Sequence, residues 1–167
     1  MNTIKLYIYH LISMFLPETK ALGFKRTLLR WSGAKIGKNV RICSSATFIG
    51  CGKLEIGDNT WIGHESMIVC SKNVKIGANC DLAPRVYVGD GSHKIDLMGT
   101  HIAGDGFSLP IVIGDGCWLC TSTVILPGST IGARSVLAAG AIAMGNYSDN
   151  VLLAGIPAIE KKKYYED

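Results

Sequence analysis

Aliphatic residues recur at every sixth position through most of this chain. The two clearest series are Ile76, Leu82 and Val88, and then Ile113, Leu119, Ile125 and Ile131. A period of six fits neither an α-helix, whose period is near 3.6, nor a single strand, whose period is 2. It fits a solenoid in which every sixth side chain points inward and three short strands complete one turn. The pattern therefore predicts an all-β parallel solenoid.

A second period, of 20 residues, is superimposed on the six-residue period. Ile36, Ile56 and Ile76 open successive blocks, so each early coil of 18 residues carries two extra residues at one corner. In the third block this corner grows into a loop over 92–111, after which the six-residue units resume and run to about Ser148. We expect stacked coils about 4.8 Å apart over 34–150. A loop on such a rigid scaffold is a common place for function.

Residues 1–33 do not share the repeat and have helical spacing instead. The first apolar series is Ile4, Ile8, Leu11, Ile12 and Phe15, and 22–31 has the pattern of a second helix. The first run is too short to span a bilayer, and it lacks the cleavage site of a signal peptide. We expect a short helical cap that covers the open edge of the first coil.

The charge of this N-terminal segment leaves a second interpretation open. Residues 1–35 contain six lysines and arginines and one acidic residue, whereas the whole chain has a net charge of +4. A basic amphipathic pair of helices can lie on an anionic membrane. Residues 1–31 could therefore contact the inner face of the cell membrane as well as cap the solenoid.

Composition narrows the classes of protein that fit this sequence. With 167 residues, of which 48% are hydrophobic and 18% charged, the chain can bury a core and form one domain. The pair Cys117 and Cys120 has no second pair and no histidine at zinc spacing, so we expect reduced packing thiols, no metal and a cytoplasmic location. The tail over 151–167 departs from the repeat, and its three consecutive lysines are typical of a solvated tail or of a phosphate contact. Elsewhere in the chain the basic residues are not interleaved with aromatic ones along one face, which argues against nucleic acid.

Three blocks of sequence resemble a known family. They are IGANCDLAPRVYVGDGSH before the loop, PIVIGDGCWLCTSTVILPGSTIG after it, and LLAGIPA near the end. From Ile36 to about Lys162 the chain resembles the hexapeptide-repeat acyltransferases, and within them the galactoside and maltose O-acetyltransferase branch and the bacterial polysaccharide O-acetyltransferases. The resemblance implies a left-handed parallel β-helix and a homotrimer with acetyl-CoA in a groove between two subunits. It also implies acetyl transfer to the hydroxyl of a sugar or lipid-linked sugar, in O-antigen, capsule or lipopolysaccharide synthesis.

The resemblance also implies roles for individual residues. His93, at the base of the loop, corresponds to the catalytic base, and the chemistry needs one because a sugar hydroxyl must lose its proton as it attacks the thioester. The positions that correspond to acetyl-CoA contacts are Trp118, Thr121, Ala139, Met144, Gly145 and Lys162. One position departs from the pattern, because Ile159 stands where the family often has a basic residue.

A second departure concerns the acceptor. The family often has an asparagine where this chain has Gly63, followed by His64 and Glu65, and we take these three with Arg85 as candidate substrate contacts. Glu65 and His93 lie nearly half a turn apart in the repeat, so they could meet only across a subunit interface. Alternatively, Glu65 pairs with Arg85, which lies 20 residues on and hence directly above it, in a surface ion pair of little energetic value.

The same scaffold can serve other functions. A zinc hydratase of the γ-carbonic anhydrase kind needs two histidines five residues apart, whereas His93 and His101 are eight apart. A catalytically degenerate structural or binding β-helix, and an acyltransferase with another donor or an amino-sugar acceptor, both stay open. His64, His101 and His10 are expected to be structural.

Overall fold

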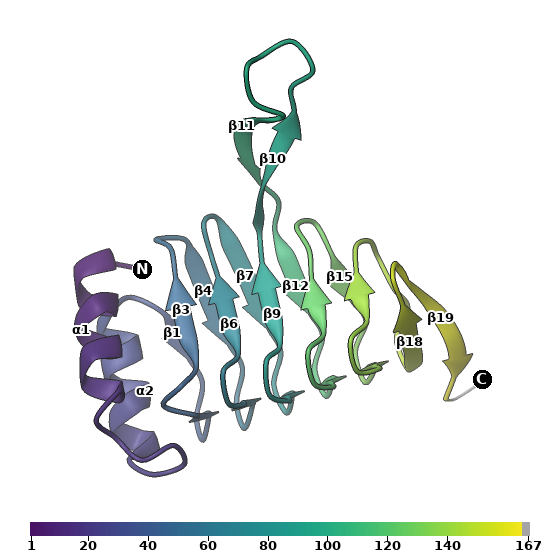
Figure 1. Ribbon diagram of the computed structural model, residues 1–167. Coiled ribbons are helices and arrows are strands. Elements are labelled where there is room, and N and C mark those ends of the chain that lie inside the picture. Colours follow the sequence, from purple (N-terminus) through teal and green to yellow (C-terminus); the bar gives the residue numbers. More distant parts are fainter. Residues whose placement is uncertain (165–167) are drawn as a thin grey trace.

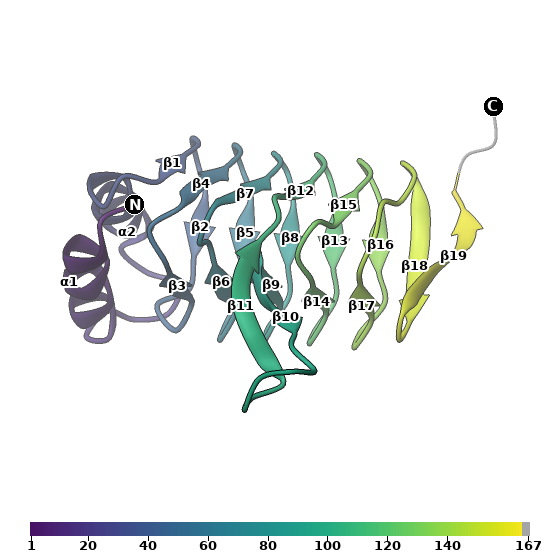
Figure 2. The same ribbon diagram turned by 90° about the horizontal axis from the view of Figure 1, so that it is seen from above.

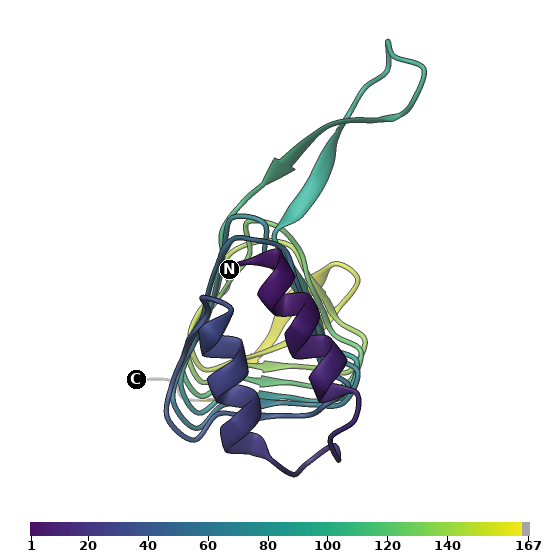
Figure 3. The ribbon, with the colours of Figure 1, turned by 90° about the vertical axis from the view of Figure 1, so that its left-hand side faces the viewer.

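The structure, a computed structural model, describes residues 1–164 and confirms the all-β solenoid with a helical cap (Figure 1). Two helices, α1 (Thr3–Ser13) and α2 (Leu22–Trp31), precede a solenoid of about six turns. Each of the first five turns contributes one strand to each of three sheets, which form the walls of a triangular prism (Figures 2 and 3). Residues 165–167 of the predicted tail lie outside the described residues.

The three sheets are parallel from coil to coil, and in-register pairs such as Ile56 with Ile76 and Leu82 with Leu119 repeat the six-residue pattern. The first sheet contains β1 (Lys35–Ile36), β4 (Lys53–Ile56), β7 (Asn73–Ile76), β12 (Ile111–Ile113) and β15 (Thr130–Ile131). The second contains β2 (Arg41–Ile42), β5 (Trp61–Ile62), β8 (Asp81–Leu82), β13 (Trp118–Leu119), β16 (Val136–Leu137), β18 (Val151–Gly155) and β19 (Ala158–Lys163). The third contains β3 (Thr47–Ile49), β6 (Met67–Val69), β9 (Tyr87–Gly89), β14 (Val124–Ile125) and β17 (Ile142–Ala143).

The core is the column of aliphatic side chains inside the prism. Leu82, Leu119, Leu137 and Leu153 stack in successive coils, and all four are fully buried. Each such side chain stabilises the fold by roughly 1.5–3 kcal/mol relative to an exposed position. The sixth-residue pattern thus marks the inward-facing positions correctly.

The small residues of the repeat join neighbouring coils at the corners. Thr60 Oγ1 donates to the carbonyl oxygen of Gly77 at 2.7 Å, and the thiol of Cys80 donates to the carbonyl oxygen of Gly114 at 3.1 Å. All six cysteines are free thiols. A hydrogen bond with Cys80, together with burial, raises the pKa of the Cys117 thiol, so this sulfur stays protonated. These contacts agree with the prediction of reduced packing thiols.

The helical cap packs against the first coil through a different face from the predicted one. Leu6 and Tyr9 are buried, whereas Ile4 and Phe15 of the predicted apolar series are 72% and 78% exposed. The helix is turned this way because the Tyr9 ring packs edge-on against Phe48, at 5.7 Å between centroids. Neither helix within residues 1–164 is long and apolar enough to cross a membrane.

The basic residues of α2 bind the edge of the first coil. Arg30 donates to the carbonyls of Ile36 and Gly37 at 2.8 and 2.6 Å, and Arg26 donates to that of Val40 at 3.0 Å. These guanidinium groups satisfy carbonyls at the open end of the solenoid, where no preceding coil exists to supply N–H donors. Much of the N-terminal positive charge therefore has a capping role.

The predicted loop is an antiparallel hairpin of β10 (Gly91–Ile95) and β11 (Ala103–Ser108) that projects from one corner of the prism (Figures 1 and 3). The tail is also more regular than expected. β18 extends the second sheet as the parallel partner of β16, and β19 folds back on it as an antiparallel strand. Val151 and Leu153 of β18 are buried against the final coils.

Candidate active site

The His93 side chain lies on β10, near the base of the projecting hairpin, and is exposed. Its Nδ1 lies 2.8 Å from the carbonyl oxygen of Gly104 on the facing strand. A carbonyl can only accept a hydrogen bond, so Nδ1 carries the hydrogen and Nε2 of the neutral ring keeps its lone pair. The hairpin thus holds this imidazole in the tautomer that a general base needs.

The base of the hairpin is anchored by Asp90, a residue that sequence reasoning missed. Its carboxylate is fully buried and accepts the backbone N–H groups of Ser71, Lys72 and Asn73 at 2.7, 2.7 and 2.8 Å. Its own carbonyl accepts the N–H of Leu109 at 2.9 Å, which closes the hairpin. The available signal was an acidic residue three positions before the histidine, opposite the two-residue corner of the preceding block.

A surface hollow of about 420 Å³ lies beside His93. Its walls come from the hairpin and from the end of β6, and the lining residues are Val69, Ser71, Gly91, Ser92, Gly106, Phe107 and Ser108. Serine hydroxyls and backbone groups beside an aromatic ring suit a small polar ligand that has one apolar face.

The candidate residues fall at two different corners of the prism. We call the first the hairpin corner, between the third and first sheets, and the second the Arg85 corner, between the second and third sheets. The hairpin corner comprises 50–52, 70–72, 90–110, 126–129 and 144–146, and the Arg85 corner comprises 43–46, 63–66, 83–86, 120–123 and 138–141. His93 shares the hairpin corner with Met144 and Gly145, which lie two coils further along.

The remaining candidates follow the Arg85 corner or the adjoining second sheet. Arg85 N–H donates to the carbonyl of His64 at 2.8 Å, and Gly140 N–H donates to that of Thr121 at 3.0 Å, so the corner residues stack from coil to coil. Trp118 on β13 and Lys162 on β19 flank this corner and are exposed. One chain therefore does not bring His93 together with these residues.

Two of the candidate acceptor contacts form the predicted surface ion pair. Arg85 Nε lies 3.3 Å from Glu65 Oε2, and both side chains are largely exposed. Gly63, by contrast, is buried, and a side chain there would meet the Leu82 carbonyl at 2.5 Å. Gly63 is thus a position where the next coil approaches closely, and it offers no side chain to a ligand.

The surface is open at the positions expected to contact the donor. Ala139 is exposed, Met144 is 59% exposed, and a methyl group added at Gly140 or Gly145 would meet nothing within 4 Å. The indole of Trp118 is 54% exposed, which leaves one face free for an apolar arm. These features fit an extended ligand that runs along the coils.

Comparison with known proteins agrees with this architecture. The model of the family described as "Bacterial transferase hexapeptide (six repeats)" matches residues 110–142. WcaF of Escherichia coli (strain K12), named for an acetyltransferase role in colanic acid biosynthesis, is 37% identical over 132 residues, which cover 79% of this chain and 70% of that protein. The galactoside O-acetyltransferase of the same organism is 32% identical over 133 residues, which cover 80% of this chain and 65% of that protein.

A solved structure shares the fold across almost the whole chain. It is a hexapeptide-repeat acetyltransferase of Vibrio cholerae O1 biovar eltor in complex with acetyl coenzyme A, with a TM-score of 0.78 and 22% identity, covering 98% of this chain and 87% of that one. The six-residue repeat, the three-walled prism and the long match to WcaF lead to one conclusion: the chain belongs to the hexapeptide-repeat acetyltransferase family.

Proposed function

We propose that this protein transfers an acetyl group from acetyl-CoA to a sugar hydroxyl during synthesis of a surface polysaccharide. Relatives named for colanic acid, galactoside and lipopolysaccharide acetyl transfer support this assignment. The observation that carries it is His93, an exposed imidazole whose Nδ1 is held by the Gly104 carbonyl, so that Nε2 is left to act as a base. The donor supplies an acetyl group activated as a thioester.

In this proposal His93 Nε2 takes the proton from the acceptor hydroxyl as that oxygen attacks the acetyl carbonyl. The positive charge that develops on the ring is stabilised at Nδ1–H by the Gly104 carbonyl. The imidazolium then returns the proton to the departing thiolate sulfur, so the enzyme ends the cycle unchanged. No covalent enzyme intermediate is needed, because the acceptor oxygen attacks the acetyl carbonyl directly.

The two-corner arrangement supports a site shared between subunits. We infer a closed homotrimer in which the hairpin corner of one prism lies beside the Arg85 corner of its neighbour. His93, Met144 and Gly145 from one subunit would then face Trp118, Thr121 and Ala139 from the next, with acetyl-CoA between them and Lys162 near its phosphates. Light scattering should give three chains per particle, and a stable, active monomer would contradict the shared site.

The acceptor in this arrangement would meet the polar side chains of the Arg85 corner. Glu65 and Arg85 offer a carboxylate and a guanidinium, which can accept from and donate to sugar hydroxyls, and His64 lies one residue away. Their mutual ion pair is exposed, so a sugar can displace it at little cost.

The function is tested by acetyl transfer to a panel of nucleotide sugars, lipid-linked sugars and free glycosides. His93→Ala should lower turnover by at least about 10²-fold while acetyl-CoA still binds, because only proton transfer is lost. His101→Ala is the matched control, since His101 is an exposed histidine of the same hairpin loop. Near wild-type turnover in the His93 variant would contradict the assignment.

We further propose that the cap contacts the cytoplasmic face of the membrane. The outward surface of α1 and the turn after it expose five large apolar side chains, namely Ile4, Tyr7, Leu11, Met14 and Phe15. Lys20 is exposed at the same end of the molecule and Lys5 is partly exposed. An apolar helix face flanked by lysines suits the boundary of an anionic bilayer.

Sedimentation with anionic vesicles tests this contact. Binding should weaken as salt is raised, since surface attraction is screened within about 10 Å at 0.1 M salt, and the double change Ile4→Ser and Phe15→Ser should remove it. Met98→Ser, at the tip of the hairpin and 97% exposed, is the control that also removes an exposed apolar side chain. Absence of binding at low salt would leave the helices with the capping role alone.

A further inference from the structure

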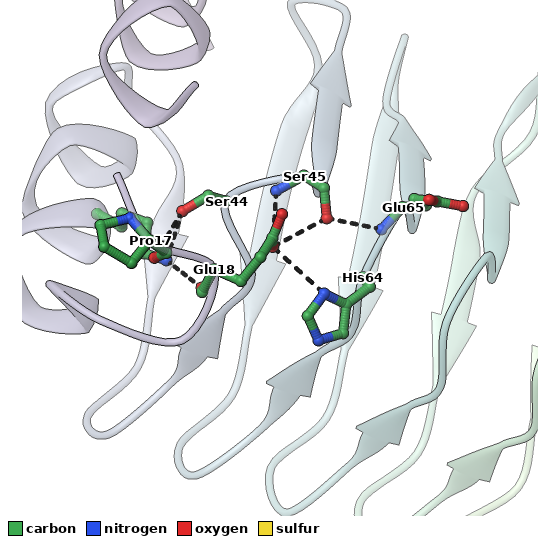
Figure 4. Close-up of polar contacts among 7 residues, drawn as sticks. Pro17, Glu18, Ser44, Ser45, His64 and Glu65 are labelled. Carbon is green, nitrogen blue, oxygen red and sulfur yellow. Dashed lines mark hydrogen bonds and ion pairs between the residues drawn. The ribbon is translucent and has the colours of Figure 1, made fainter. Parts of the chain in front are cut away.

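The linker between α1 and α2 is tied to the Arg85 corner by a polar network (Figure 4). The carboxylate oxygen Oε2 of Glu18 accepts from both the N–H and the hydroxyl of Ser45, at 3.1 and 3.0 Å, and lies 3.3 Å from His64 Nδ1. The hydroxyl of Ser45 in turn accepts the N–H of Glu65 at 3.0 Å. One acidic side chain from the cap thus reaches the first two coils at once.

The thiol of Cys43 lies close to the side chains of Glu18 and His64. Cys43 follows β2 and is fully buried. Its backbone N–H donates to the Ile62 carbonyl at 3.0 Å, whereas its thiol makes no hydrogen bond within residues 1–164. Its Sγ, a carboxylate oxygen of Glu18 and a ring nitrogen of His64 all lie within 4.8 Å of one another. The three residues are far apart in sequence, which is why no spacing motif revealed them. They meet only because the linker crosses the ends of two stacked coils.

This donor set has a defined chemical preference. One sulfur, one nitrogen and one carboxylate oxygen suit a borderline ion such as Zn²⁺, whereas Mg²⁺ and Ca²⁺ prefer oxygen alone. Zinc bonds of 2.0–2.3 Å place tetrahedral ligand atoms about 3.3–3.8 Å apart. The three atoms lie within 4.8 Å of one another, so each pair needs to close by at most about 1.0–1.5 Å. The side chains of Glu18 and His64 are 43% and 44% exposed, so an ion and a completing water can reach the site from solvent.

We propose that Glu18, Cys43 and His64 form a Zn²⁺ site that staples the helical cap to the first two coils. On binding, Cys43 Sγ–H loses its proton to solvent and the sulfur bonds to the ion. Ser45 stays on Glu18 as an outer hydrogen-bond donor that orients the carboxylate. The ion joins the linker, the first coil and the second coil, so its role is structural.

The surrounding charges are compatible with this site. Lys25, which is buried, donates from Nζ to the Glu18 carbonyl at 2.7 Å and to Ser44 Oγ at 3.0 Å. Its charge opposes the cation but favours the thiolate, and the carboxylate and thiolate together carry two negative charges. Burial raises the pKa of the Cys43 thiol to about 11, so one proton should be released for each Zn²⁺ bound near neutral pH.

The first test measures zinc binding to the full chain, without a histidine tag and after treatment with a chelator. Adding Zn²⁺ at about 100 times its Kd should raise the Tm by about 5–10 °C. Cys43→Ser and His64→Gln should each weaken binding by at least about tenfold. The matched controls are Cys51→Ser and His101→Gln, which change an exposed cysteine and an exposed histidine elsewhere and should bind as the wild type does.

The second test uses Co²⁺ on the unmodified chain, so it does not depend on any variant folding. Cobalt at this site should show a thiolate charge-transfer band and the visible bands of a four-coordinate ion, and Zn²⁺ should displace both. A Tm that does not respond to Zn²⁺, or a cobalt spectrum without the thiolate band, would overturn the proposal. Because the readouts are binding and stability, failure here leaves the acetyltransferase proposal untouched, and the reverse also holds.

Discussion

Removal of the Asp90 carboxylate should loosen the hairpin that carries His93. Three backbone N–H groups lose their acceptor in Asp90→Ala, and a hydrogen bond to a charged group contributes about 1.5–3 kcal/mol. Ser71 and Lys72 are exposed, so their N–H groups can turn to water, whereas Asn73 is only partly exposed. We therefore expect the free energy of unfolding to fall by about 2–4 kcal/mol rather than by the full sum.

The isosteric change Asp90→Asn separates shape from charge. The amide oxygen can keep the bonds that Oδ2 accepts from Lys72 and Asn73, but the amide NH₂ then faces the N–H of Ser71. One hydrogen bond is lost and two donors face each other, so the free energy of unfolding should fall by about 1–3 kcal/mol. Asp115→Ala is the matched control, because Asp115 also accepts a corner N–H, that of Ala78 at 2.8 Å, at a corner without the hairpin.

Urea denaturation and steady-state acetyl transfer together test this reasoning. Both Asp90 variants should lower kcat more than they raise the KM for acetyl-CoA, because the proposed donor contacts lie on other coils while His93 lies three residues away. The Asp115 variant should cost about 0.5–1.5 kcal/mol of stability and leave kcat unchanged. Unchanged kcat in Asp90→Ala under conditions where the protein is folded would refute the positioning role.

Three further predictions concern the donor groove, the core and the C-terminal strand. Ala139→Trp should block the proposed donor site and abolish acetyl-CoA binding in isothermal titration, whereas Lys162→Ala should weaken binding by only about 0.5–1 kcal/mol, as loss of an exposed charge does. Equal, unchanged affinities in the two variants would place the donor elsewhere. Leu82→Ala should lower the free energy of unfolding by about 2–5 kcal/mol in urea denaturation, because Leu82 is fully buried. A decrease of less than about 1 kcal/mol in that free energy would argue against a tightly packed prism. The N–H of Ser148 donates to Glu160 at 2.7 Å and holds the pKa of that carboxyl below its ordinary value. The Tm advantage of wild type over Glu160→Gln should therefore be present at neutral pH and disappear as the pH falls through the lowered pKa, and a Tm difference independent of pH would contradict this.

Much of the fold could be predicted from the sequence because each coil of a solenoid uses the same local rule. Every sixth residue enters the prism, so the repeat alone identified inward-facing positions such as Leu82 and Leu119, which are both fully buried. The enlarged corner after β9 likewise located the hairpin and His93. Neighbours 20 residues apart, such as Glu65 and Arg85, could be paired because the block length sets the vertical register.

Contacts that depend on how non-repeating segments dock required the tertiary structure. The apolar spacing of α1 predicted a helix, but the packed face was decided by Tyr9 meeting Phe48. The partner of His93 Nδ1, the Gly104 carbonyl, was set by the pairing of two hairpin strands. No periodicity encodes such contacts, since each is made once between segments of unrelated sequence. The same reason hid the meeting of Glu18 with Cys43 and His64, because it follows from the path of the linker over the stacked coils.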